Sequence, residues 1–129
     1  MPDAKTVKDW IRYARMDLSA AEYLQGHSPL PIEIICYHCQ QAAEKALKAV
    51  LARHDTDVPR THDLTILLAA ATQCENSMQS LFKQVNRLTN YATFTRYPSD
   101  IEISEADMKI ALKYAEDILT HPAVIQASS

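Results

Sequence analysis

The chain has 129 residues, enough for one domain that buries roughly two thirds of the surface exposed by its unfolded chain. Its formal net charge of -3 at pH 7 excludes a protein that holds extended nucleic acid through bulk positive charge. The single glycine argues against a sheet-rich fold, because strand connections usually need turn glycines. We predict one all-α domain over residues 1–129.

The cysteines and the apolar pattern predict where the protein works. Three cysteines, an odd number, and the lack of a long apolar segment predict free thiols in a reducing cytoplasm, with no membrane contact. Cys36 and Cys39 have the CxxC spacing of zinc and redox sites, but no second cysteine pair accompanies them. We therefore predict buried structural thiols, with redox or metal chemistry as the alternative.

Apolar residues three or four positions apart predict a first amphipathic helix over 6–25. Gly26 fits a left-handed stop of this helix, and a second helix should follow the prolines and run to about His54. A loop over 55–61 then precedes a short helix over 64–71, for which the polar residues just before it supply the cap.

The second half of the chain predicts two more long helices. One covers 78–96 and stops there because Pro98 disfavours helical geometry at the residue before it. Ser104 opens a capping-box-like start for the last helix, which Pro122 ends. Four long helices with modest connections pack most simply as an antiparallel four-helix bundle, with the additional short helix of 64–71 across one end.

Polar side chains line one border of the second predicted helix. Each helical residue advances by about 100°, so His38, Gln41 and Lys45 fall within about 60° of one another. Their donors suit a phosphate or a carboxylate partner. For His38 the alternative is an internally bonded histidine at the edge of the core. Glu44 and Lys48, four residues apart, are predicted to form an exposed ion pair.

Two further groups of polar residues stand at predicted helix ends. Asp63 caps the short helix, or it belongs to a functional edge near a groove between helices that the polar border of the second helix would line. His62 beside it is the more exposed of the two. Arg96 sits at a helix C-terminus, where the helix dipole favours a cation. The alternative is that its planar guanidinium holds a phosphate while Tyr97 stacks on a base.

An ordered set of motifs resembles the HEPN domain family, named for its occurrence in higher eukaryotes and prokaryotes and for presumed nucleotide binding. The segment DLSAA at 17–21 is similar to the family's Asp-Leu-x-x-Ala pattern. The run CYHCQQAAEKALK at 36–48 reproduces the family's cysteine, aromatic residue and histidine before a Gln-Gln-Ala-Ala-Glu-Lys stretch. THDL at 61–64 and RYP at 96–98 complete the set, which spans nearly the whole chain.

The resemblance implies a helical bundle that commonly forms homodimers. It also implies pairing with a minimal nucleotidyltransferase, since small prokaryotic members often form such toxin and antitoxin couples. Family members that are ribonucleases carry an arginine followed after four to six residues by a histidine, and no arginine of this chain has that histidine. Without it, the obvious general acid or base is missing. We predict a non-catalytic protein that binds a nucleotide, a minimal nucleotidyltransferase partner, or both, with no cofactor beyond such a nucleotide.

Two alternatives remain open. One is a ribonuclease toxin with an atypical active site that uses Arg96, Tyr97 and His38. The other is a purely structural dimerisation module, because a core stripe and a dimer stripe have the same period. The residues predicted to bind a ligand or partner are His38, Gln41, Lys45, His62, Asp63, Arg96 and Tyr97.

Overall fold

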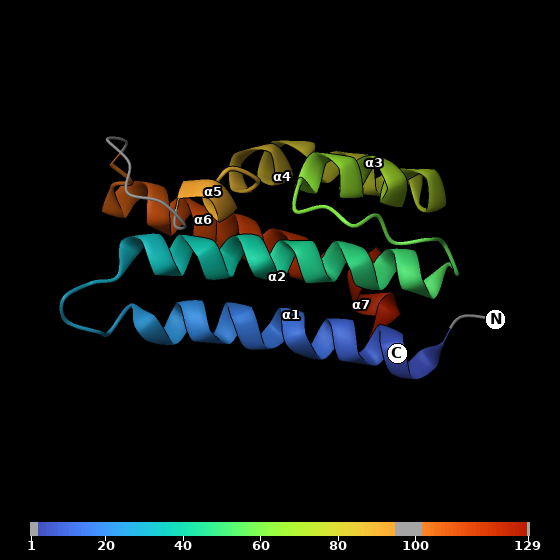
Figure 1. Cartoon of the computed structure of the whole chain (residues 1–129), viewed down its shortest axis with the longest axis horizontal. Coiled ribbons are helices and arrows are strands. Elements are labelled where there is room, and N and C mark those ends of the chain that lie inside the picture. Colours follow the sequence, from blue (N-terminus) through green and yellow to red (C-terminus); the bar gives the residue numbers. More distant parts are fainter. Residues whose placement is uncertain (1–2, 95–101, 129) are drawn as a thin grey trace.

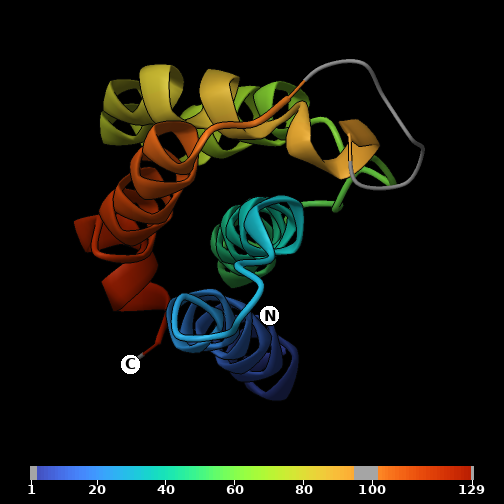
Figure 2. The ribbon, with the colours of Figure 1, turned by 90° about the vertical axis from the view of Figure 1, so that its left-hand side faces the viewer.

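The computed structural model describes residues 3–94 and 102–128. Helices make up every regular element of these residues, which confirms the all-α prediction. Helix α2 (Ile32–Arg53) lies in the middle of the molecule, and the other helices are arranged around it (Figure 2). This central position buries far more of α2 than one amphipathic stripe would, and it decides the environment of the polar residues that α2 carries.

Helix α1 (Ala4–Leu24) packs antiparallel to α2 along most of its length (Figure 1). It begins at Asp3, whose carboxylate accepts a hydrogen bond from the backbone N–H of Lys5 at 3.0 Å. The predicted left-handed stop at Gly26 is wrong, because Gly26 has no positive φ and its N–H closes a further right-handed turn on the Tyr23 oxygen at 3.2 Å. Small side chains on α2 let the neighbouring helices approach closely. The alanines of α2 that are fully buried are Ala42, Ala43, Ala46 and Ala49.

The short helix α3 (Leu64–Cys74) lies elsewhere than predicted. It runs beside the C-terminal half of α2 instead of across one end of the bundle (Figure 1). Its buried residues explain the placement, because Leu64, Leu67 and Ala71 form a stripe that must face the core. The loop over 54–63 therefore returns along α2 before α3 begins.

The helix predicted over 78–96 is divided into three pieces. A 3₁₀-helix, η1 (Asn76–Leu81), leads into α4 (Phe82–Leu88), and a separate turn, α5 (Tyr91–Phe94), follows. Phe82 was also predicted to face inward, and this is wrong, because Phe82 stands at the border of the stripe and is 49% exposed. The other predicted inward-facing residues are nevertheless buried, because a stripe of period 3.6 survives a short break between helices. They are Met78, Leu81, Val85, Leu88 and Ala92. The predicted end of this helix at Arg96 lies outside the described residues.

The last two helices are α6 (Glu105–Leu119) and α7 (Pro122–Ala127). The predicted capping box is confirmed, because Ser104 Oγ accepts from the Asp107 N–H at 3.0 Å and Asp107 accepts from the Ser104 N–H at 3.0 Å. Pro122 was expected only to end the last helix. It opens α7 instead, because the N–H groups of the first turn have no acceptor within the helix, so the N–H that proline lacks is not missed there.

The two CxxC cysteines are buried, as predicted for structural thiols. Cys36 and Cys39 are fully covered and free, and burial raises the pKa of the Cys36 thiol to about 12. Burial likewise raises the pKa of Cys39. In the part of the chain that the structure describes, no three His, Cys, Asp or Glu side chains gather as a metal site. None of its helices has both the length and the apolar character needed to span a membrane.

We expect Cys74, which is half-buried, to react first with an aromatic disulfide reagent. Cys36 and Cys39 should react only as fast as the bundle opens, because their thiolates are rare and covered. Thiol titration with mass mapping, in native buffer and in guanidinium chloride, measures both classes. Rapid modification of Cys36 or Cys39 in the native protein would contradict this and favour the redox alternative.

Candidate functional site

One carboxylate joins α1 to α2 at the border of the core. Asp17 on α1 accepts from Lys45 Nζ at 2.5 Å and pairs with His38 Nδ1 at 2.9 Å. The side chain of Asp17 is only 14% exposed, so it needs these partners. The structure thus gives His38 the internal partner that the alternative hypothesis required. Two of the predicted site residues are held in the seam between helices, with their remaining surface facing out.

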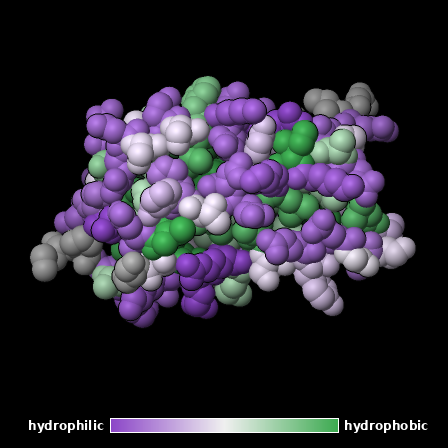
Figure 3. Space-filling model, turned by 180° about the vertical axis from the view of Figure 1, so that it is seen from behind, coloured by the Kyte–Doolittle hydropathy of each residue, from purple (hydrophilic) through white to green (hydrophobic). Residues whose placement is uncertain are grey.

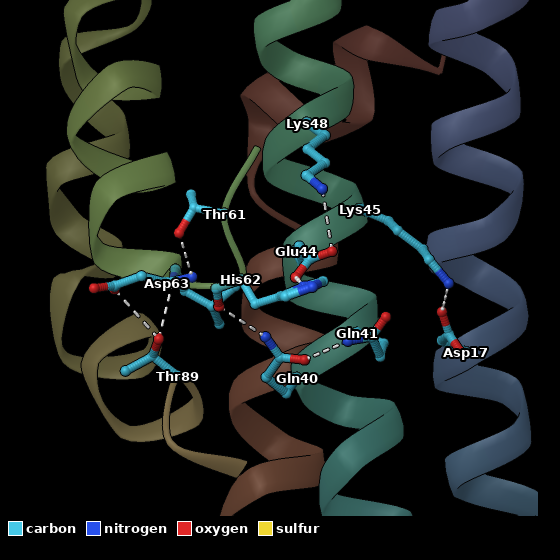
Figure 4. A network of polar contacts seen from close by, with 11 residues as sticks. Asp17, Gln40, Gln41, Glu44, Lys45, Lys48, Thr61, His62, Asp63 and Thr89 are labelled. Carbon is cyan, nitrogen blue, oxygen red and sulfur yellow. Dashed lines mark hydrogen bonds and ion pairs between the residues drawn. The ribbon is translucent and has the colours of Figure 1, made fainter. Parts of the chain in front are cut away.

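A second carboxylate, Glu44, is buried in the middle of α2. It is 3% exposed, with Oε1 at 2.8 Å from His62 Nδ1 and Oε2 at 3.2 Å from Lys48 Nζ (Figure 4). The ammonium group of Lys48 also lies 5.3 Å from the centre of the Trp10 ring. The prediction of an exposed Glu44–Lys48 pair is wrong, because the returning loop over 54–63 covers this side of α2.

Two neighbouring glutamines complete the attachment of that loop. Gln40 is fully buried, and its Nε2 donates to the backbone oxygen of His62 at 3.2 Å. Its Oε1 accepts from Gln41 Nε2 at 2.7 Å, which holds the amide of Gln41 against the helix (Figure 4). His62 is therefore fixed twice, through its backbone by Gln40 and through its ring by Glu44. Its side chain remains 56% exposed, so the ring edge that carries Nε2 is presented at the surface.

Asp63 caps α3 and faces the junction between α4 and α5. Its carboxylate accepts from the Thr65 hydroxyl at 2.6 Å and from the Thr65 N–H at 2.9 Å. The hydrogen bond from the Thr65 hydroxyl is the main reason why the pKa of Asp63 is lowered. Across the junction, the hydroxyl oxygen of Thr89 accepts from the Leu64 N–H at 2.9 Å. The start of α3 and the end of α4 are thus joined by direct bonds.

A shallow hollow of about 220 Å³ opens at this junction. His62 and Asp63 line one side of it, and Thr89, Asn90 and Ala92 line the other. The predicted site residues therefore fall into two groups. His38 and Lys45 lie at the α1–α2 seam, whereas His62 and Asp63 lie at the hollow. Gln41 stands between the groups and reaches the second through Gln40, while Arg96 and Tyr97 lie outside the described residues.

Sequence reasoning missed three residues that organise this region, namely Asp17, Gln40 and Glu44. All three belong to the segments that carry the family resemblance, and this was the signal that could have found them. A helical wheel could not, because it places Gln40 and Glu44 beyond the apolar arc. Only the packing of α3 and its preceding loop against α2 widens the buried face enough to include them.

The fold and the site define a small helical-bundle domain in which Asp17 of α1 pairs with side chains of α2, and Glu44 of α2 holds His62 of the loop before α3. The family model of the HEPN domain matches residues 7–123, and the chain belongs to this family. The structure is also similar to the crystal structure of an archaeal HEPN homologue, with 28% sequence identity and a TM-score of 0.67. That match covers 88% of this chain and 91% of the other. No curated protein matches the chain.

Proposed function

We propose that this HEPN protein is a non-catalytic binding domain that engages a minimal nucleotidyltransferase partner, a nucleotide, or both. The observation that carries the proposal is the fixed, outward edge of His62 beside the hollow at the α3 start. A histidine that is held by a buried carboxylate through Nδ1 presents Nε2 in one orientation. Such a preset group costs little conformational entropy when it binds.

The chemistry of this edge suits an anionic group. When protonated, the His62 ring donates from Nε2, and the backbone and hydroxyl groups at the start of α3 add polar surface. The hollow of about 220 Å³ is smaller than the roughly 300–1,000 Å³ that usually encloses a small ligand. It therefore fits one part of a ligand, either a phosphate group or a side chain of a partner.

The remaining features of the proposal rest on membership of the family. Arg96 and Tyr97 follow α5 in the sequence, and we keep them as proposed contacts to phosphate and base. His38, Gln41 and Lys45 extend the proposed surface along α2. We place the protein in the cytoplasm as a homodimer, as the helical half of a toxin–antitoxin couple.

Replacing His62 with alanine should remove partner or nucleotide binding while the protein stays folded. The ring is mostly exposed, and Glu44 keeps Lys48 as its partner in the variant. The test is affinity purification of tagged protein from its native cell, with mass spectrometry of the proteins that copurify. Calorimetry with ATP and GTP measures nucleotide binding directly.

The matched control is His54→Ala. His54 also pairs a ring nitrogen with a carboxylate, Glu75, at 2.9 Å, but at the far end of α2. Wild type and His54→Ala should recover a nucleotidyltransferase or bind nucleotide, and His62→Ala should do neither. Equal recovery and equal affinity in all three proteins would remove His62 from the proposed site.

A further inference from the structure

A second hollow, of about 490 Å³, lies on α1 beside the end of α7. It is lined by Lys8, Arg12 and Arg15, by the exposed Met16 above the buried Ile11, and by Ser128. None of the described residues that line it is acidic. The face of the molecule that carries α1, α6 and α7 shows apolar surface between hydrophilic side chains (Figure 3). This hollow is separate from the His62 edge, which lies across α2.

The cations of this hollow are largely unused within the protein. In residues 3–94 and 102–128, Lys8 and Arg15 have no carboxylate within ion-pair distance. Arg12 reaches Asp9 only at 3.7 Å and stacks over the Tyr13 ring at 4.6 Å. A chain with a net charge of -3 has thus gathered three cations on one helix face, and only Arg12 has a carboxylate partner within the described residues. Such a local positive surface favours an anionic partner.

The shape of the hollow favours a rod over a small molecule. Among the described residues, all but one of those that line it come from α1, so the hollow lies along a single helix. A small ligand there would lack the 70–90% burial that is typical of its sites. Lys8, Arg12 and Arg15 follow one another at helical spacing and span about 10 Å, roughly two turns. Their aliphatic stems, with Ile11 and Met16, make the lining mainly apolar.

We propose that this hollow docks an acidic amphipathic helix of a partner protein. Carboxylates of that helix pair with Lys8, Arg12 and Arg15, and an apolar side chain packs against the exposed Met16. Nucleic acid fits less well, because none of the described lining residues offers an aromatic ring for base stacking and the net charge of the whole chain is negative. This is recognition of a helix in a groove, in which the charge of the helix determines which partner binds.

The test is fluorescence anisotropy with a labelled synthetic helix that has a leucine ridge flanked by glutamates. A second peptide keeps the leucines but carries lysines in place of the glutamates. We expect the acidic peptide to bind, with an affinity that falls as salt rises, and the basic peptide not to bind. In the double variant Lys8→Glu and Arg15→Glu, affinity should fall at least about tenfold, equivalent to ~1.4 kcal/mol.

The matched control is Lys109→Glu, which reverses an exposed lysine on α6 and should leave the affinity unchanged. Circular dichroism verifies that each variant is folded. Equal binding of both peptides, or full affinity in the double variant, would overturn the proposal. It would also fail if a single-stranded RNA bound through Lys8 and Arg15 while the acidic peptide did not. If the protein forms a dimer without any partner and the double variant is monomeric, the hollow is an interface between two copies of this chain, and the proposal is also overturned.

Discussion

Replacing Glu44 with alanine should lower the free energy of unfolding by about 3 kcal/mol and release the loop that carries His62. The carboxylate is buried and binds both His62 and Lys48, so its removal leaves the mostly buried ammonium group of Lys48 without a counter-charge. Urea denaturation gives the loss of stability. Amide hydrogen exchange over 54–63 should rise in the variant, because the ring of His62 loses its anchor.

Glu44→Gln is the control that separates charge from shape. Its amide oxygen can still accept from His62 Nδ1, but it no longer balances the charge of Lys48. We expect a loss of stability about half that of Glu44→Ala, with exchange in the loop nearly unchanged. Equal and small effects of both substitutions would show that Glu44 does not hold the loop, and the fixed orientation of His62 would then need another cause.

Replacing Leu47 with alanine should destabilise the protein by roughly 2–5 kcal/mol. Leu47 is fully buried on the central helix, so the variant loses the free energy gained by burying the leucine side chain. It also leaves a cavity, because the surrounding helices are too closely packed to move in and fill it. The melting temperature and urea midpoint measure the effect.

Ile34→Ala on the same helix is the matched control. Ile34 is 51% exposed, near the start of α2, and its truncation should cost well under about 1 kcal/mol. Similar losses in the two variants would contradict the central position of α2. They would mean that its N-terminal turn is as tightly packed as its middle.

The two predictions share a cause, which is the position of α2. On a helix that is covered on most sides, most side chains must be either apolar and packed in the core or polar and hydrogen-bonded. Gln40 and Glu44 are the buried polar groups of this helix, and their hydrogen bonds offset the cost of removing them from water. Both groups bind the same loop. The edge proposed to bind a partner is therefore built on the most constrained element of the fold.

Much of the local structure could be predicted because it depends on neighbouring residues in the sequence. The apolar spacing indicated the long helices and the buried face of α1. The capping box at Ser104 follows from short-range hydrogen bonds that any chain with those residues can make. The burial of Cys36 and Cys39 followed from their place in the apolar arc of α2.

Other features depend on which elements come together, and the sequence pattern was silent or misleading there. The period of the apolar stripe over 78–94 did not reveal the break between α4 and α5, since both sides of the break keep the same face buried. The contact of His38 and Lys45 with Asp17 joins residues on two helices, and no local rule aligns them.

The sequence by itself determined the helical class, the N-caps at Asp63 and Ser104, and the family, because periodicity, capping and ordered motifs depend on nearby residues. Only the tertiary structure decided that Glu44 is buried, that it pairs with the ring of His62 and that three cations of α1 share one hollow. The physical reason is that burial and pairing between elements depend on how each helix is rotated against its neighbours, and side chains from the whole chain set that rotation together.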